Sequence, residues 1–132
     1  MTVKYTIGEK VKCEELAEVF ASSGIKRPYE DLERMKKMIE SADLLVTARD
    51  NGKLIGIARA LTDYCYCCYL SDLAVDKQYQ QQGIGSQLIS YVQTEIGEET
   101  ALILLSAPSA MEYYPKAGFQ KADNAFLIPR KK

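Results

Sequence analysis

The sequence predicts an α/β domain built around a mixed sheet, and three observations lead to this class. Helix-like and strand-like hydrophobic patterns alternate along the 132 residues. Asn51-Gly52, between two apolar runs, is the strongest short signal for a β-hairpin. A glycine-rich turn, "QQQGIGS" at residues 80–86, joins a strand-like segment to an amphipathic one, which is typical of a strand followed by a helix.

The N-terminal elements are predicted from periodicity and from their end signals. Residues 2–8 alternate apolar and polar side chains and predict a strand. Residues 13–24 have helical spacing and end at Gly24, a residue suited to a left-handed helix cap. Residues 27–42 predict a second helix, with Pro28 tolerated near its start.

The rest of the chain is mainly strands, with two further helices. The predicted elements are strands at 44–50, 53–63 and 65–75, a helix at 83–97, a strand at 101–107, a helix at 109–118 and a strand at 124–129. Ser109 and Glu112 have the spacing of a capping box for the last helix. The order is β-α-α-β-β-β-α-β-α-β, and the length predicts one domain spanning residues 1–132.

Composition narrows the classes of partner. Hydrophobic residues make up 47% of the chain, which suffices for a core. Seventeen basic and eighteen acidic residues give a formal net charge of −1, so we expect no nucleic-acid partner and no anionic membrane surface. No apolar run approaches the ~20 residues that span a bilayer, and no signal peptide is evident. We therefore expect a cytoplasmic protein.

The four cysteines predict neither a metal site nor a disulfide. Cys65 and Cys68 form a C-x-x-C pattern, but the chain has no histidine and no second such pair to complete a zinc site. The pattern lies in a strand-like segment and not at a helix N-terminus, where a redox pair would lie. We interpret Cys65, Cys67 and Cys68 as reduced residues on the two faces of a strand.

The glycine-rich turn favours an anion. The first N–H groups of a helix have no intrahelical partner, and glycines let a phosphate approach them closely. A Rossmann fingerprint fails because Leu88 stands where its third glycine belongs, and the G-K-[ST] ending of a P-loop is absent. Neither a dinucleotide nor a nucleoside triphosphate is therefore the favoured ligand.

Two segments resemble the Gcn5-related N-acetyltransferase (GNAT) superfamily. Gln80, Gly83 and Gly85 fit Q/R-x-x-G-x-G/A, and "YLSDLAVDKQYQQQGIGSQLI" resembles motif A of that family. "AMEYYPKAGF", at residues 110–119, is similar to motif B. The resemblance covers essentially the whole chain. It implies a central, mixed, mostly antiparallel sheet of six to seven strands flanked by about four helices, with a splayed strand pair forming an acetyl-CoA cleft.

The resemblance also implies an activity, acetyl transfer from acetyl-CoA to a primary amine of a small molecule, with no metal. Strand backbone would bind pantetheine, and the glycine-rich turn would bind the diphosphate. The implied cofactor-binding residues are Leu73, Ala74, Val75, Gln80, Gln81, Gln82, Gly83, Ile84, Gly85 and Ser86. Tyr114 matches the tyrosine that in many members protonates the departing thiolate. The alternative for Tyr114 is a ring that only packs on the sheet.

The general base and the acceptor site are less defined. Asp72, on the strand that leads to the acetyl site, is the best candidate for the base, and the alternative is a carboxylate that only ends the strand. Location in the family fold gives the candidates for acceptor binding: Arg27, Tyr29, Arg59, Tyr64 and Tyr66.

Two other functions remain open on the sequence. One is acetylation of a protein lysine or N-terminus, which an acidic acceptor groove would favour. The other is an acyl-CoA-binding regulatory module without catalysis. Small members of the family often pair through sheet edges or the C-terminal strand, so a homodimer is the preferred assembly.

Overall fold

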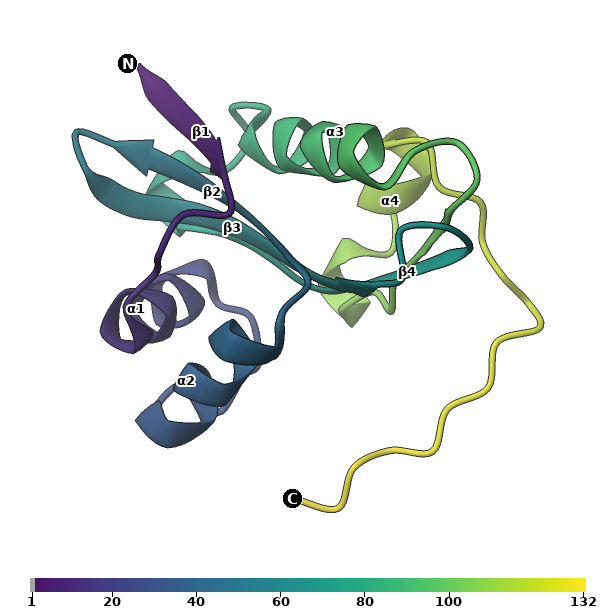
Figure 1. Cartoon of the computed structure of the whole chain (residues 1–132), viewed down its shortest axis with the longest axis horizontal. Helices are drawn as coiled ribbons and strands as arrows, with labels where there is room; N and C mark the ends of the chain where they lie inside the picture. Colours follow the sequence, from purple (N-terminus) through teal and green to yellow (C-terminus); the bar gives the residue numbers. More distant parts are fainter. Residues whose placement is uncertain (1) are drawn as a thin grey trace.

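The computed structural model describes residues 2–132, in which helices cover both faces of a five-stranded sheet (Figure 1). The strands are β1 (Val3–Ile7), β2 (Leu44–Asp50), β3 (Lys53–Thr62), β4 (Cys67–Val75) and β5 (Ala101–Ile103). They lie in the order β1-β2-β3-β4-β5, antiparallel from β1 to β4, with β5 parallel to β4. The predicted mixed, mostly antiparallel sheet is confirmed, with five strands in place of the six to seven expected.

The hairpin between β2 and β3 follows the sequence signal. Asn51 and Gly52 have φ values of 49° and 83°, and the flanking pair is Asp50 opposite Lys53. Positive φ at both central residues matches the right-handed twist of the strands, which is why an Asn-Gly pair favours this turn.

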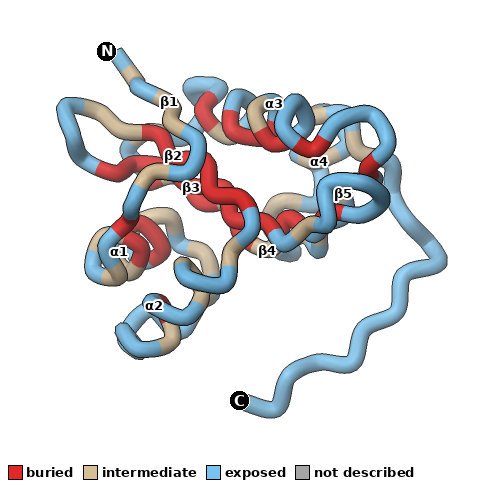
Figure 2. Tube along the Cα trace, viewed as in Figure 1, coloured by how far each residue is buried: buried red, intermediate tan, exposed pale blue. Residues whose placement is uncertain are grey.

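The helices divide the core into two layers. The α-helices are α1 (Cys13–Ser23), α2 (Leu32–Ser41), α3 (Ile84–Ile96) and α4 (Tyr113–Lys116), and the short 3-10 helices are η1 (Lys77–Tyr79) and η2 (Pro108–Ala110). Leu16 and Phe20 of α1 and Met35 of α2 pack against one face of the sheet, and α3 packs Leu88 and Val92 against the other. The buried parts of the chain accordingly follow the central strands and the inward sides of these helices (Figure 2).

The second predicted helix begins later than expected. Asp31 is the N-cap of α2, and its side chain accepts a hydrogen bond from the Arg34 N–H at 3.1 Å. This cap fixes the start of the helix, so residues 27–31 form a loop between α1 and α2. Arg27 lies in that loop and reaches β4.

The predicted helix at 109–118 is wrong in length and in its cap. Only Tyr113–Lys116 is α-helical; Ser109 lies in η2, and the Glu112 N-cap makes no side-chain capping bond. Pro115 explains the difference. It has no N–H for the bond that a helix begun at residue 109 would require there.

Two strand predictions are also corrected. β4 begins at Cys67 and not at Cys65, because Asp63 Oδ1 accepts hydrogen bonds from the N–H groups of Cys65, Tyr66 and Cys67 and so makes a turn. Residues 124–129 form no strand; they extend away from the body, where Phe126 is 98% exposed (Figure 2). No strand pairs with this segment, and a strand needs a paired neighbour.

A β-bulge interrupts β4 at Ser71. Arg59 of β3 pairs with Asp72 and Ala60 pairs with Leu70, so Ser71 has no residue opposite it. The bulge changes which face the side chains cover. Leu70 packs on the α3 side, whereas Ala74 packs on the side of α1 and α2.

No helix between residues 2 and 132 combines the length and the apolar character that a membrane crossing requires.

Candidate active site

The centre of the site is the C-terminal half of β4. β4 pairs with β5 only from Cys67 to Tyr69, so its residues 70–75 have a strand neighbour on the β3 side alone. β4 and β5 therefore separate after Tyr69, as expected for the splayed strand pair. In an antiparallel pair, half of the backbone groups of a strand point away from the partner. The Asp76 N–H donates to the Ile55 carbonyl of β3 at 2.8 Å, so by alternation the backbone groups of Ala74 also face β3. The backbone groups of Leu73 and Val75 therefore face the open edge, and those of Ala74, expected at this site, do not.

This open edge leads to the N-terminus of α3. Gly83 is the N-cap, with φ +82° and no side-chain capping bond. The first intrahelical bond runs from the Gln87 N–H to the Gly83 carbonyl at 3.0 Å. The N–H groups of Ile84, Gly85 and Ser86 therefore point out of the helix end, where the positive end of the macrodipole favours an anion.

Side chains of the turn fix its shape. Gln80 Nε2 donates to the Val75 carbonyl at 2.8 Å and to the Ser23 carbonyl at 3.3 Å, which ties the end of β4 to the end of α1. The buried Asp76 accepts from the Gln78 N–H at 2.9 Å. Gln81 has φ +65°, and Gln81 and Gln82 are exposed. The amide of Gln80 is thus engaged within the protein, whereas the other two side chains face solvent.

Behind β4 a buried carboxylate holds two arginines. Asp72 is 0% exposed; its Oδ1 accepts from Arg27 Nε at 2.5 Å, and its Oδ2 accepts from Arg59 Nε. Arg27 Nη2 also donates to the Ser71 carbonyl at 2.8 Å, and Arg59 Nη2 donates to Ser71 Oγ at 3.1 Å. Two guanidinium groups therefore share one carboxylate directly at the bulge. The cluster carries a net positive charge, and the Arg27 side chain remains 28% exposed.

Tyr114 lies on the side of the sheet that α3 covers. Its half-buried ring meets the Phe119 ring edge-on, with centroids 5.5 Å apart, and packs against the core under α3. Burial raises the pKa of the Tyr114 phenol above its ordinary value of 10, Tyr113 raises it further, and the Arg27 guanidinium partly opposes both. The phenol therefore stays protonated through the neutral range, as a proton donor must.

The acceptor candidates do not all gather at this place. Arg27 and Arg59 meet at Asp72, and Tyr29 follows Arg27 in the loop between α1 and α2. Tyr64 and Tyr66 lie in the turn before β4, where the Tyr64 hydroxyl donates to the Asp43 carbonyl at 2.8 Å. Tyr66 and Asp72 are six positions apart in the sequence, roughly 20 Å along an extended chain.

Sequence reasoning missed two residues of the site. Ser71 is the bulge residue whose carbonyl and hydroxyl accept from the arginines. Tyr113 Oη lies 3.0 Å from Ser86 Oγ, which links α4 to the first turn of α3. In residues 2–132, no three cysteine, aspartate or glutamate side chains are grouped as a metal site.

Comparison with known proteins agrees with this arrangement. Residues 10–127 match the family model described as the acetyltransferase (GNAT) domain. A crystal structure titled a protein of unknown function, SA2161, probable acetyltransferase, from meticillin-resistant Staphylococcus aureus, has 26% identity and a TM-score of 0.84 and covers 98% of this chain and 100% of its own. An aminoglycoside N-acetyltransferase, AAC(6')-Iy, solved in complex with CoA, shares the fold at a TM-score of 0.72 with 18% identity, covering 99% of this chain and 96% of its own.

Curated sequences give the same family. The uncharacterized N-acetyltransferase ycf52 of Pyropia yezoensis is 28% identical over 114 residues, which are 81% of this chain and 64% of that protein. The chain spans 64% of the length of this relative. It spans 27% of the length of the chloroplastic GCN5-related N-acetyltransferase 2 of Arabidopsis thaliana. The family model, the open edge of β4 and the uncapped start of α3 lead to one conclusion: the chain belongs to the GNAT superfamily and is an acetyltransferase domain of that type.

Proposed function

We propose that this protein transfers the acetyl group of acetyl-CoA directly to a primary amine of a small molecule. The observation that carries the proposal is the continuity of three features: the open half of β4, the uncapped N-terminus of α3 and the phenol of Tyr114 beside them. The backbone of β4 would bind pantetheine, and the N–H groups of the turn would bind the diphosphate.

The chemistry requires no covalent enzyme intermediate. The amine nitrogen bonds to the thioester carbonyl carbon, the carbon–sulfur bond breaks, and the Tyr114 hydroxyl gives its proton to the departing thiolate. A backbone N–H near Leu73 stabilises the developing oxyanion. The ammonium proton leaves to water or to Asp72, the best side-chain candidate in the sequence. Both oxygens of Asp72 already accept hydrogen bonds from arginines, so transfer to Asp72 would have to compete with these bonds. Four free cysteines suit a reducing compartment, and we place the reaction in the cytoplasm.

The charge of the cluster favours a small acceptor over a lysine-rich peptide. Arg27 and Arg59 carry two positive charges and Asp72 carries one negative charge. The cluster beside the proposed acetyl site is therefore cationic and repels polycations. An amine that also bears a carboxylate would find donors on the exposed part of Arg27. The aminoglycoside enzyme of the same fold is named for a small-molecule substrate, which agrees with this choice.

An amine panel tests the proposed function. The panel contains amino acids, simple amines, polyamines and a lysine-rich peptide, and thiol release from acetyl-CoA is measured. We expect turnover with small amines, highest for those that carry a carboxylate. Turnover with the peptide alone would make the protein a lysine acetyltransferase. A silent panel together with tight CoA binding would make it a regulatory module.

Gly83→Ala is expected to weaken the binding of CoA at least about tenfold. Its φ of +82° is unfavourable for a side chain, so the helix start must shift and lose hydrogen bonds to the diphosphate. Gly97→Ala is the matched control, because Gly97 ends the same helix with φ +80° and equally open surroundings. Calorimetry should show a lower affinity in the first variant only. Equal affinities in both variants would remove the anion site from α3.

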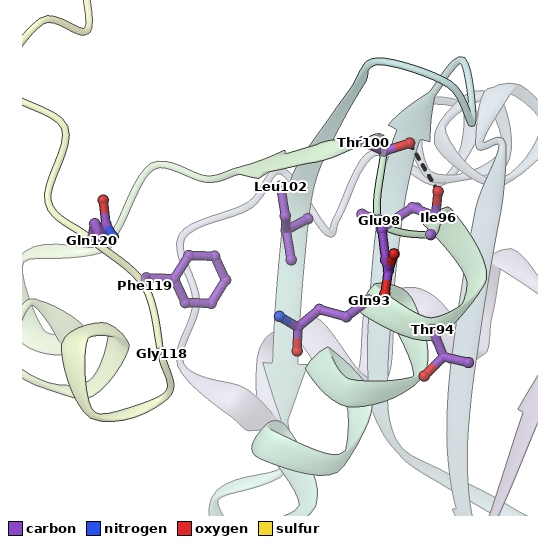
Figure 3. Close-up of a pocket in the computed structure, with 10 residues that line it drawn as sticks. Gln93, Thr94, Ile96, Glu98, Thr100, Leu102, Gly118, Phe119 and Gln120 are labelled. Atoms are coloured by element: carbon purple, nitrogen blue, oxygen red, sulfur yellow. Dashed lines mark hydrogen bonds between the residues drawn. The ribbon is translucent and has the colours of Figure 1, made fainter.

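We also propose a homodimer in which the C-terminal segment of one copy adds to β5 of the other. Phe126 and Ile128 are 98% and 95% exposed, and β5 is an edge strand. A cavity of about 620 Å³ lies beside β5, with Leu102 and Phe119 on its wall (Figure 3). Antiparallel addition would bring the basic residues 130–132 to the exposed Glu98 and Glu99, so opposite charges select this direction.

Light scattering tests the dimer. We expect the wild type to have a dimer mass at micromolar concentration and the double variant Phe126→Ser, Ile128→Ser to have a monomer mass. Leu32→Ser, which changes an exposed apolar residue on α2, is the control and should stay dimeric. A monomeric wild type would contradict the assembly, and a dimeric double variant would move the interface away from this segment.

A further inference from the structure

Tyr113 joins the two helices that border the site. It is the first residue of α4, and its hydroxyl lies 3.0 Å from Ser86 Oγ in the first turn of α3. The residue is 37% exposed, so a ligand can reach it. Nothing in the sequence motifs gives this side chain a task, since the family role falls on the neighbouring Tyr114.

Gly85 shows how closely the hydroxyl approaches the helix. A Cβ atom at residue 85 would lie 3.0 Å from Tyr113 Oη and 3.9 Å from Val75 Cγ2. Gly85 is helical with no positive φ, so its backbone conformation does not require a glycine. Glycine leaves room here for the phenol, which a larger residue would displace by a few tenths of an ångström. The phenol oxygen thus occupies the corner where the end of β4 meets the first turn of α3.

The ring is held by its neighbours. Tyr113 and Tyr114 pack edge to face, with centroids 5.2 Å apart and planes at 77°. Tyr114 packs in the same manner on Phe119. One short helix therefore fixes both phenols, one beside the open edge of β4 and the other over the N-terminus of α3.

We infer that the Tyr113 hydroxyl donates a hydrogen bond to the diphosphate of acetyl-CoA, and so binds from α4 the same anion that α3 binds through its N–H groups. The inference rests on the proposed function. Two hydroxyl groups meet at this corner, and either one can donate to the other, so their mutual bond uses one hydrogen only. With Ser86 as the donor, the Tyr113 hydrogen is free for an anionic oxygen beside the positive end of the helix.

Tyr113→Phe tests the contact, because it keeps the ring and its packing. We expect the Kd of CoA to rise about tenfold, the loss of one hydrogen bond to a charged group. Dephospho-CoA, which keeps the diphosphate, should lose the same factor. Turnover of S-acetylpantetheine, which has no phosphate, should be unchanged. Tyr91→Phe, on α3 and stacked on Tyr5, is the matched control and should bind CoA normally.

Ser86→Ala separates a direct contact from an indirect one. In that background Tyr113→Phe should still weaken CoA several-fold. No further loss would mean that Tyr113 only orients Ser86 and would overturn the inference. Unchanged or tighter CoA binding by the single variant Tyr113→Phe would also overturn it. A wild type that binds no CoA would instead overturn the proposed function itself, so the two failures are distinguishable by the wild-type titration.

Discussion

Asp72→Ala is expected to lower the free energy of unfolding by about 3–5 kcal/mol, the cost of breaking a buried ion pair by removing one partner. Asp72 is 0% exposed and accepts from both Arg27 and Arg59. Removing it leaves two guanidinium groups close together without an anion. Because Arg27 keeps some contact with water, we expect a value near the lower end of this range. Urea unfolding monitored by circular dichroism measures it.

Two controls accompany this variant. Asp123→Ala changes an exposed aspartate in the C-terminal segment and should cost less than about 0.5 kcal/mol. Asp72→Asn keeps the shape and removes the charge, so it should lose much of the stability as well. A loss below about 1 kcal/mol in both Asp72 variants would mean that water reaches the cluster and supports the arginines.

The same variant bears on the base. If Asp72 takes the ammonium proton, Asp72→Asn should retain folded protein at low temperature but lower kcat about 10²–10⁴-fold, with little change in the KM of the amine. If Asp72 only holds the arginines, the loss should fall mainly on the KM of the amine. The two roles are thus separable although both lower activity.

Local signals predicted the elements whose determinants lie within a few residues. The β2–β3 hairpin follows from Asn51 and Gly52 alone, and α3 follows from its periodic apolar residues and from the glycines at both of its ends. The strand at 124–129 was predicted by the same kind of local pattern, but a strand also needs a neighbour. Its pattern therefore could not decide whether the segment is paired.

Only those residues of the candidate site that belong to sequence motifs could be predicted. The turn at 80–86 and Tyr114 came from a resemblance; in the structure the turn leads from β4 into α3, and Tyr114 packs against the core under α3. Asp72 and Arg27 are 45 residues apart, and nothing local relates them. The bulge at Ser71 depends on the register between two strands, and the reach of Tyr113 to Ser86 depends on how α4 packs. These contacts depend on the tertiary packing of distant segments, which local sequence patterns do not specify.

Tyr114→Phe is expected to lower kcat about 10²–10⁴-fold, the range in which general acid catalysis contributes. Phenylalanine keeps the edge-on contacts with Phe119 and Tyr113 and removes only the hydroxyl. The affinity for acetyl-CoA should stay nearly constant, because in the proposed site backbone groups of β4 and α3 bind the rest of the molecule. kcat and kcat/KM should therefore fall together, as they do when an interaction exists only in the transition state.

The pH dependence supplies a second, independent readout of Tyr114. Burial raises the pKa of the phenol above 10, so the donor form persists through neutral pH and is lost only as the pH rises past that value. The wild type should therefore lose activity above about pH 10, and Tyr114→Phe should lack this loss while its rate stays low throughout. Tyr113→Phe provides the contrast on the adjacent residue, since its effect should fall on the Kd of CoA with little change in kcat. If Tyr114→Phe lowers kcat less than about threefold, single-turnover kinetics decides the reason. A slowed chemical step would mean that product release hides the proton transfer. A chemical step of normal rate would mean that Tyr114 is only a ring that packs on Phe119.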